Sequence, residues 1–442
     1  MAPSAYSHSS PHDPAARPIR IGMLGFGTVG SGAFRMLENN REAITRKVGR
    51  SLEIVRIGIR DSEKPRSLPP SIFTTDLDSI LADPEIDVVL ELIGGIDPAA
   101  RLVEEALERG KNVVTANKEL IAKHGSRLVH MAKARGLDLH FEAAVGGGIP
   151  LVQPLKHQLA GNDVLKLMGI LNGTTNYILT RMTQEGADLE DVLSEAQTLG
   201  YAEADPTNDV DGFDAVYKLA ILASICFGKQ VPIDGVHREG IRGVNKLDIK
   251  FAEALGYRIK LLGIVEPAED GAILARVHPT LIPKTHPLAS VNDVYNAVWI
   301  HGDFVGDVML SGRGAGSDPT ASAVIGDLID VGRNIVAGGP GSAIPYDEGM
   351  ETVSIEQLET AYYVRMNVVD RPKVLGTIAG IFGDHEVSLA AMEMRVVDEA
   401  NEIGEIVFLT HRCRESSFSN ALTALQKSDA VREICSWIRV EA

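Results

Sequence analysis

The chain has 442 residues, which exceeds the usual size of one domain and fits two or three. Its formal net charge of −17 excludes broad binding to nucleic acid or an acidic membrane, because phosphate groups repel it. The three cysteines have no CxxC spacing, so we expect neither a disulfide framework nor a zinc site. This cysteine usage also predicts a reducing, cytoplasmic location. No apolar run is long enough to span a membrane, so we expect no membrane contact.

The first part of the chain predicts a tail followed by a nucleotide-binding domain. Residues 1–17 are rich in Ser, Pro, His and Ala and lack the pattern of a secretory signal, so they predict a disordered tail. Short apolar runs at 19–27, 52–61, 86–95, 112–120 and 137–145 predict strands, with helices at 31–48 and 98–111. This alternation is typical of an α/β fold with a doubly wound parallel sheet, here over residues 18–150.

The rest of the chain predicts two further domains. Helices at 187–200 and 211–228 and β-like runs at 257–267, 271–282 and 295–303 indicate an α+β domain over 151–310. Residues 311–338 form a glycine turn and a helix that we expect to complete the first domain. Residues 339–358 include Pro340, Gly341, Pro345 and Gly349 and predict a linker. Residues 359–442 follow the order βαββαβ, which indicates a small ferredoxin-like domain.

A glycine-rich turn follows the first predicted strand. Gly25-Phe26-Gly27-Thr28-Val29-Gly30 stands between that strand and a helix, which is the context in which a GxGxxG motif binds a dinucleotide. The glycines let the backbone approach a pyrophosphate, and the helix N-terminus offers N–H groups to it. The alternative is a tight turn with a structural role only.

Charged residues at two strand ends are further candidates for the cofactor site. Asp61 could hold a ribose 2′-hydroxyl, which would favour NAD, whereas Arg60 could hold a 2′-phosphate, which favours NADP. Lys64 and Arg66 add positive charge, so we expect NADP with NAD as the alternative; all four could also be solvated loop charges. Lys118 follows the fourth strand, at the edge where open α/β sheets bind ligands.

Two stretches carry groups suited to a substrate and a cation. Residues 200–218 hold five carboxylates within 12 residues, and Asp214 and Lys218 share one helix face because they are four apart. This stretch could hold a substrate ammonium and supply acid–base chemistry, or could be a surface helix with one salt bridge. Residues 141–150 combine Glu142 with three glycines, a pattern that fits either a hard-cation site or a flexible hinge.

With these motifs in place, the chain resembles homoserine dehydrogenase over nearly its whole length. The resemblance is carried by GFGTVG (25–30), ELIGG (91–95), TANK (115–118), FEAAVGGGIP (141–150), GILNGTTNYIL (169–179), GYAEADPTNDVDGFDAVYKLAIL (200–222) and GAGSDPTASAV (314–324). It implies NAD(P)-dependent interconversion of L-homoserine and L-aspartate 4-semialdehyde, in the synthesis of threonine, isoleucine and methionine. The C-terminal unit resembles an ACT domain, which binds small effectors.

The resemblance also assigns roles to residues. Gly25–Gly30, Lys118 and Gly316 would contact the cofactor, and Glu203, with Gly200, Tyr201 and Asp214, would form the substrate site. Lys218 would be the acid–base group, assisted by Lys118. A monovalent cation, sodium by this likeness, would lie near Glu142 and the carbonyls of Val145, Gly147 and Ile149. The family is commonly dimeric or tetrameric, so we expect a homodimer or homotetramer.

The ACT-like unit and two rival activities leave alternatives open. Its effector site would lie at the turn 369–372 and at 374–376, with threonine as one candidate. The run 388–394 departs from the polar run that many relatives have there, which leaves the effector open. Another semialdehyde reductase and a sensor without turnover are the rival functions. Aspartate semialdehyde dehydrogenase is disfavoured because it needs a nucleophilic cysteine.

Overall fold

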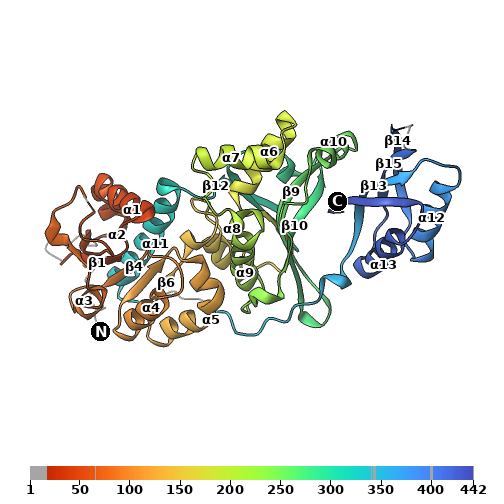
Figure 1. Ribbon diagram of the computed structural model, residues 1–442. Helices are drawn as coiled ribbons and strands as arrows, with labels where there is room; N and C mark the ends of the chain where they lie inside the picture. Colours follow the sequence, from red (N-terminus) through yellow and green to blue (C-terminus); the bar gives the residue numbers. More distant parts are fainter. Residues whose placement is uncertain (1–16, 65, 340, 342–344, 399–401, 442) are drawn as a thin grey trace. The chain divides into compact units, whose positions relative to one another are not determined.

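The computed structural model describes residues 17–64, 66–339, 341, 345–398 and 402–441, so the predicted tail lies outside the described residues except for Arg17 (Figure 1). The chain divides into two compact units. The first unit comprises the chain up to residue 158 together with 228–230 and 315–348. The second comprises 159–227, 231–314 and 349–442. Among the described residues, no helix combines the length and the apolar character that crossing a membrane requires.

The first unit contains a parallel sheet in the order β3-β2-β1-β4-β5-β6, which confirms the predicted doubly wound fold. Its strands are β1 (Ile19–Leu24), β2 (Leu52–Gly58), β3 (Phe73–Thr74), β4 (Val88–Glu91), β5 (Asn112–Thr115) and β6 (Leu139–His140). Its helices are α1 (Thr28–Asn39), α2 (Arg41–Val48), α3 (Leu77–Ala82), α4 (Ala99–Glu108), α5 (Lys118–Ala134) and α11 (Ser317–Ala337). The single helix expected over 31–48 is wrong in one respect, because it is interrupted at Asn40.

The core of this unit explains why residues 317–337 belong to it. Apolar side chains of α11, such as Val324 and Leu328, are fully buried against those of β1, β2, α1 and α2. At Gly32 of α1, an added Cβ would lie 2.6 Å from Ser317 Oγ, so the two helices meet at a position where a larger residue would clash. The last helix of the first unit therefore rests directly on the helix that follows the glycine turn.

The second unit is built on one large sheet in the order β12-β11-β7-β9-β10-β17-β13-β15-β14. Its strands are β7 (Val164–Ile170), β8 (His237–Arg238), β9 (Tyr257–Pro267), β10 (Ile273–Pro283), β11 (Tyr295–Gly302), β12 (Gly306–Arg313), β13 (Glu359–Val369), β14 (Leu389–Asp398), β15 (Ile403–Thr410), β16 (Cys413–Arg414) and β17 (Val431–Val440). Its helices are α6 (Gly173–Glu185), α7 (Leu189–Thr198), α8 (Thr207–Val210), α9 (Phe213–Phe227), α10 (Lys246–Ala254), α12 (Val374–Asp384) and α13 (Glu415–Gln426).

The C-terminal part has the predicted βαββαβ order, and its antiparallel strands lie in the order β17-β13-β15-β14. It has its own apolar core, which includes Tyr362, Phe382, Phe408 and Phe418. It is not a separate sheet, because the end of β17 pairs in parallel with β10, at Arg439 opposite Thr280 and Val440 opposite Leu281. The sequence pattern gave no sign of this continuity.

The segment expected as a linker, residues 339–358, is bonded along much of its described length. In the first unit Tyr346 is buried, and Gln230 donates its backbone N–H to the carbonyl oxygen of Asp347 at 2.6 Å. In the second unit Ile273 donates its backbone N–H to the carbonyl oxygen of Glu351 at 3.0 Å. The domain boundaries derived from the sequence stay predictions.

Candidate active site

The glycine turn after β1 has the geometry of an anion-binding loop. Gly25 has a φ of +101°, and an added Cβ would lie 2.7 Å from the carbonyl oxygen of Leu92. At Gly30 an added Cβ would lie 2.4 Å from the carbonyl oxygen of Gly25, so the turn closes tightly on the start of α1. Gly27 caps α1 with no side-chain hydrogen bond and has open space beside it. An uncapped helix N-terminus next to open space suits a phosphate group.

Gly316 lies beside the same helix start. It has a φ of +120° and caps α11, and the hydroxyl of the next residue, Ser317, donates to the carbonyl oxygen of Thr28 at 2.9 Å. The structure therefore brings together Gly316 and the Gly25–Gly30 turn, which are almost 300 positions apart in the sequence. Phe26 and Val29 of the turn face inward and pack against the core of the unit.

Positive charge collects beyond the carboxyl end of β2. Arg60 is exposed there, and a cavity of about 480 Å³ is lined by residues that include Ile59, Lys64, Arg66 and Phe73. The Arg66 guanidinium lies 5.2 Å from the centre of the Phe73 ring and donates to the carbonyl oxygen of Lys64 at 2.8 Å. Asp61 accepts the backbone N–H of Glu63 at 2.9 Å, so its carboxylate caps its own turn.

A buried polar network fixes the ends of β4 and β5. The Thr115 hydroxyl donates to Glu91 Oε2 at 2.5 Å, and Glu91 Oε1 accepts the backbone N–H of Ile93 at 2.8 Å. Asn117 caps α5 by accepting the N–H of Leu120 at 3.1 Å, and its amide donates to the carbonyl oxygen of Gly95 at 2.6 Å. Lys118, the first residue of α5, is half-buried. The network holds the loop after β4 and the start of α5 in place.

The second unit contains a buried cluster around Lys218. The Lys218 ammonium donates to the Asp214 carboxylate at 2.7 Å and to the carbonyl oxygen of Leu171 at 2.8 Å. Both charged residues lie on one face of α9, as their spacing predicted, and both are buried. The Asn172 amide donates to Asp214 at 2.9 Å and to Asp209 at 2.7 Å. Burial raises the pKa of Asp209, and the nearby Asp214 charge acts in the same direction.

Comparison with known proteins decides the family. The model of the homoserine dehydrogenase NAD-binding domain matches residues 25–142, that of homoserine dehydrogenase matches 150–329, and that of the ACT domain matches 362–430. A homoserine dehydrogenase of Synechocystis is 46% identical over 96% of this chain and 99% of its own length. The chain belongs to the homoserine dehydrogenase family. It is accordingly an oxidoreductase that acts on a CH–OH group, which confirms the predicted family and enzyme class.

Solved structures of the homoserine dehydrogenase family agree. A homoserine dehydrogenase from Thiobacillus denitrificans has a TM-score of 0.91 and 44% identity, and the match covers 96% of this chain and 98% of that one. A hyperthermophilic archaeal homoserine dehydrogenase in complex with NADPH has a TM-score of 0.60 and 27% identity, covering 71% of this chain and 98% of that one. A relative from Mycobacterium tuberculosis is 44% identical over 96% of this chain and 98% of its own length.

The remaining residues expected at the substrate site lie on the segment before α8. The carbonyl oxygen of Tyr201 accepts the Thr174 hydroxyl at 2.7 Å, and the Tyr201 ring lies 5.1 Å from the ring of Tyr177. Glu203 is exposed, and none of the described hydrogen bonds joins its carboxylate to the Lys218 cluster. Gly200 closes the preceding helix with a φ of +76°. The roles of these three homoserine dehydrogenase residues stay predictions.

The expected cation site of the homoserine dehydrogenase lies in a buried, tightly bonded turn. The Glu142 carboxylate accepts the backbone N–H groups of Leu151, Val152 and Gln153 at 2.6 to 2.8 Å. Burial raises the pKa of Glu142, and these three donors act against that rise. Gly146 and Gly147 have φ values of 71° and 55°, so the predicted donors Val145, Gly147 and Ile149 flank a left-handed turn.

In this turn, backbone carbonyl oxygens are better placed than Glu142 to bind a hard cation. Both carboxylate oxygens of Glu142 already accept hydrogen bonds. Among the residues that the structure describes, no group of three or more His, Cys, Asp or Glu side chains could hold a metal ion together. That observation leaves the carbonyl site as a prediction, because carbonyl oxygens would supply most of its ligands.

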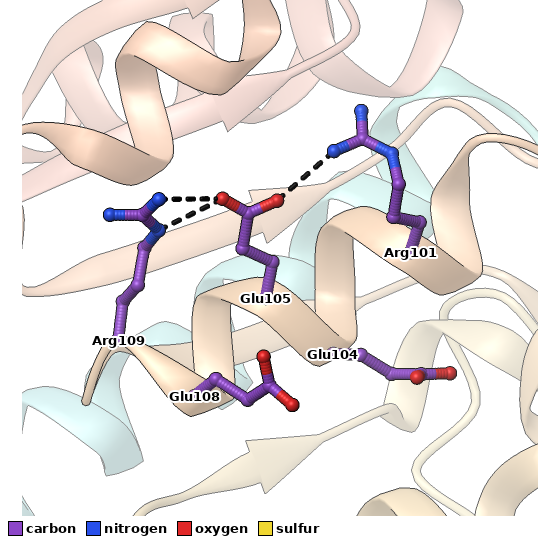
Figure 2. A pocket seen from close by; sticks show the side chains of 5 residues that line it. All are labelled: Arg101, Glu104, Glu105, Glu108 and Arg109. Atoms are coloured by element: carbon purple, nitrogen blue, oxygen red, sulfur yellow. Dashed lines mark hydrogen bonds and ion pairs between the residues drawn. The ribbon is translucent and has the colours of Figure 1, made fainter.

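A further hollow, of about 540 Å³, lies along α4 and contains none of the predicted site residues among its described lining (Figure 2). Figure 2 shows Glu105 between Arg101, at 3.0 Å, and Arg109, at 2.9 Å, all from one helix. These side chains are partly exposed and pair with one another, so we interpret the hollow as part of a surface network of ion pairs.

Sequence reasoning missed two members of the Lys218 cluster, Asn172 and the carbonyl of Leu171, whereas Asp209 is one of the five carboxylates noted in residues 200–218. Leu171 and Asn172 lie in the turn between β7 and α6, and Asp209 lies in the short helix α8. Asn172 also caps α6 by accepting the N–H of Thr175 at 2.8 Å, so one side chain both starts the helix and binds the two carboxylates. The signal available was the polar turn that interrupts an apolar strand–helix run.

Proposed function

We propose that this homoserine dehydrogenase interconverts L-aspartate 4-semialdehyde and L-homoserine, in the cytoplasmic synthesis of threonine, isoleucine and methionine. The observation that carries the proposal is the buried Lys218–Asp214 pair with Asn172 and Asp209 beside it. It combines a proton donor with carboxylates that suit a substrate ammonium. When bound, the nicotinamide cofactor supplies the hydride that reduces the aldehyde carbon.

The residues of the chain perform the other steps. The Lys218 ammonium stabilises the negative charge that develops on the carbonyl oxygen and donates its proton there; it takes the proton back in the reverse reaction. Asp214 and the carbonyl of Leu171 fix the direction of two of its N–H donors. Asp209, Asp214 and Glu203 bind the substrate ammonium, with Gly200 and Tyr201 beside them. Lys118 orients the cofactor or supports the same developing charge.

The first test is oxidation of NADPH with aspartate semialdehyde, repeated with NADH. Turnover with this aldehyde supports the assignment. No turnover with either cofactor, in folded protein that still binds NADPH, would favour a sensor or an enzyme for another aldehyde.

The cysteines do not favour the rival activity of aspartate semialdehyde dehydrogenase, which needs a nucleophilic cysteine. Burial raises the pKa of the Cys226 thiol to about 12, and the pKa values of Cys413 and Cys435 are raised as well, so no cysteine here is an activated nucleophile.

NADP is the proposed cofactor, with NAD as the alternative. The exposed Arg60 and the nearby Lys64 and Arg66 offer a 2′-phosphate positive charge, while Asp61 is engaged by its own turn. The archaeal relative solved with NADPH is consistent with this choice. Arg60→Ala should raise the KM for NADPH more than the KM for NADH. Equal effects on both cofactors would remove Arg60 as the residue that discriminates.

A monovalent cation, sodium in our proposal, would be held by Glu142 and the carbonyls of Val145, Gly147 and Ile149. Such an ion would stiffen the turn at 145–149 and would not carry charge in the reaction. Activity in sodium, potassium and choline salts at equal ionic strength tests the site. Equal rates in all three would contradict it.

The ACT domain is proposed to bind an amino-acid effector such as threonine, near the turn at 369–372 and residues 374–376. That turn is held by Arg371, whose guanidinium donates to Glu402 at 2.7 Å, and Leu375 is exposed beside it. Titrating the activity with threonine tests this proposal, and no inhibition at millimolar concentration would count against threonine.

We also propose a homodimer or homotetramer. β12 is an edge strand of the large sheet, and Tyr295, Phe304 and Met309 of the β11–β12 hairpin are exposed apolar side chains. Light scattering on the purified full-length chain measures the assembly state directly, and a monomer at micromolar concentration would contradict the proposal.

A further inference from the structure

A short segment of the second unit, residues 237–242, lies against the turn between α8 and α9; we call it the clasp. Ile241 of the clasp donates its backbone N–H to the carbonyl oxygen of Val210 at 2.8 Å. At Gly240 an added Cβ would lie 2.3 Å from that same oxygen, so the approach requires glycine. Because α8 carries Asp209 and α9 carries Asp214 and Lys218, the clasp supports the turn that joins the site carboxylates.

Two arginines of the clasp hold the middle of this turn. Arg242 binds the Asp211 carboxylate through two hydrogen bonds, Nε to Oδ1 at 2.6 Å and Nη2 to Oδ2 at 3.1 Å. Arg238 donates to the backbone carbonyl oxygen of Asp211, and its guanidinium lies 3.6 Å from the ring centre of Phe213, the first residue of α9. Arg242 therefore binds Asp211, and Arg238 contacts both Asp211 and Phe213, the two residues that flank Gly212, which has a φ of +83°.

The opposite side of the clasp is tied to the ACT domain through Glu239. Glu239 Oε1 accepts an N–H of Arg439 at 3.0 Å and lies 2.8 Å from His237 Nε2. Arg439, on β17, is buried and also binds Glu415 of α13 with two N–H groups. Burial raises the pKa of Glu239, but the hydrogen bond from His237 and the Arg439 charge outweigh this and leave it lowered. The carboxylate is thus ionised where it meets Arg439.

We propose that Glu239 is a positioning residue for the reaction: anchored by Arg439, it fixes the clasp and, through it, Asp209 and Asp214. The inference rests on the proposed function for what these carboxylates bind. Its physical basis is that the contacts between the clasp and this turn fall on residues 210–213, which lie between the two carboxylates. The backbone of the clasp is itself held on β10, where His237 and Arg238 pair with the strand and Glu239 donates its N–H to the carbonyl oxygen of Val277 at 2.7 Å. Loss of the Glu239 charge removes the side-chain anchor of the clasp on Arg439, leaves its backbone on β10, and lets the arginine side chains and the turn they hold shift.

The test uses the full-length chain with Glu239→Gln, which keeps the shape of the side chain and removes its charge. Glu253→Gln is the matched control, because both carboxylates are 35% exposed and paired with an arginine, Arg439 and Arg258 respectively. We expect Glu239→Gln to raise the KM for aspartate semialdehyde by roughly 2- to 30-fold. kcat should fall together with the rise in this KM, because Asp214 also orients the Lys218 ammonium, whereas the KM for NADPH should change by less than about twofold.

Variants at the other end of the clasp separate a positioning role from general destabilisation. Arg242→Gln should raise the same KM, and Arg242→Lys, which keeps the charge, should have a smaller effect. In the Glu239→Gln/Arg242→Gln double variant, the rise should be smaller than the product of the single effects, since both act through one turn. A rise equal to that product would show two independent routes and overturn the single clasp.

Hydrogen exchange supplies a readout that does not depend on turnover. Peptides covering 207–214 and 237–242 should exchange faster in Glu239→Gln than in the wild type, and Glu253→Gln should match the wild type. If Glu239→Gln matches Glu253→Gln in both KM and exchange, the inference is overturned, as it is if the KM for NADPH rises equally. If the wild type itself does not reduce aspartate semialdehyde, the proposed function fails, and exchange alone still decides whether Glu239 holds the turn.

Discussion

Replacing Lys218 by methionine keeps an unbranched apolar stem of similar length and removes the ammonium. The Asp214 carboxylate is only 5% exposed, accepts the Lys218 ammonium at 2.7 Å and also accepts the amide of Asn172 at 2.9 Å. Removing one partner of a buried ion pair costs about 3–5 kcal/mol. In a unit of this size that corresponds to a fall in Tm of roughly 6 to 20 °C. Because the proton donor is lost as well, kcat should fall by about 10²- to 10⁴-fold.

A second variant separates the two effects. Lys218→Met combined with Asp214→Asn removes both charges of the buried ion pair, so it should recover most of the lost Tm and none of the lost kcat. Scanning calorimetry measures the Tm of the two variants, and steady-state rates with both substrates measure their kcat. The KM for NADPH should stay unchanged and serves as the control. Turnover of wild-type size in Lys218→Met, or recovered turnover in the double variant, would show that the lysine has a structural role only.

Three further results are expected. Gly27→Ala should leave Tm unchanged, because open space lies where its added Cβ would be, but should weaken nucleotide binding in a fluorescence titration. Gly30→Ala should lower Tm, because its added Cβ would lie 2.4 Å from a backbone oxygen. Burial and the Arg258 charge lower the pKa of Lys260 to about 8, so its charge destabilises the fold below pH 8 and this cost disappears toward pH 10.5. The unfolding free energy of wild type relative to Lys260→Met should therefore rise by about 3 kcal/mol between pH 8 and 10.5, and a flat difference would refute the burial argument. Arg276→Met should cost about 3 kcal/mol in a denaturant titration, since the fully buried guanidinium bridges Glu266 and Glu441; an unchanged midpoint would contradict it.

Local sequence patterns predicted the elements that bury a continuous apolar run. Short-range patterns were enough to predict three features: the strand at Ile19–Leu24, the glycine turn after it, and the placement of Asp214 and Lys218 on one helix face. In each case the residues that form the pattern are close in sequence. The two-residue strands β3 and β6 gave a weaker signal, because pairing with a neighbour defines them and a two-residue run has no periodicity.

Contacts between distant segments were beyond the reach of these patterns. Asn172 meets Asp209 and Asp214 only because β7 and α9 pack together, and no spacing rule links positions 37 and 42 residues apart. The parallel pairing of β10 with β17 is non-local in the same way. The roles of Glu203 and Lys118 come from the family resemblance and stay predictions.

The continuity of the large sheet limits how the ACT domain can act on the rest of the second unit. Moving it away as a body would break the β10–β17 pairing and leave the buried charges of Arg276 and Glu441 without each other, at a cost of several kcal/mol. Coupling free energies between sites are typically 1–3 kcal/mol, which is too little to separate such an interface. A signal from the proposed effector site at 369–376 would therefore have to pass as a small shift within the sheet. β17 pairs with β13, and its Arg439 binds Glu239 of the clasp. A small shift of β17 would therefore reach the clasp without breaking the β10–β17 pairing.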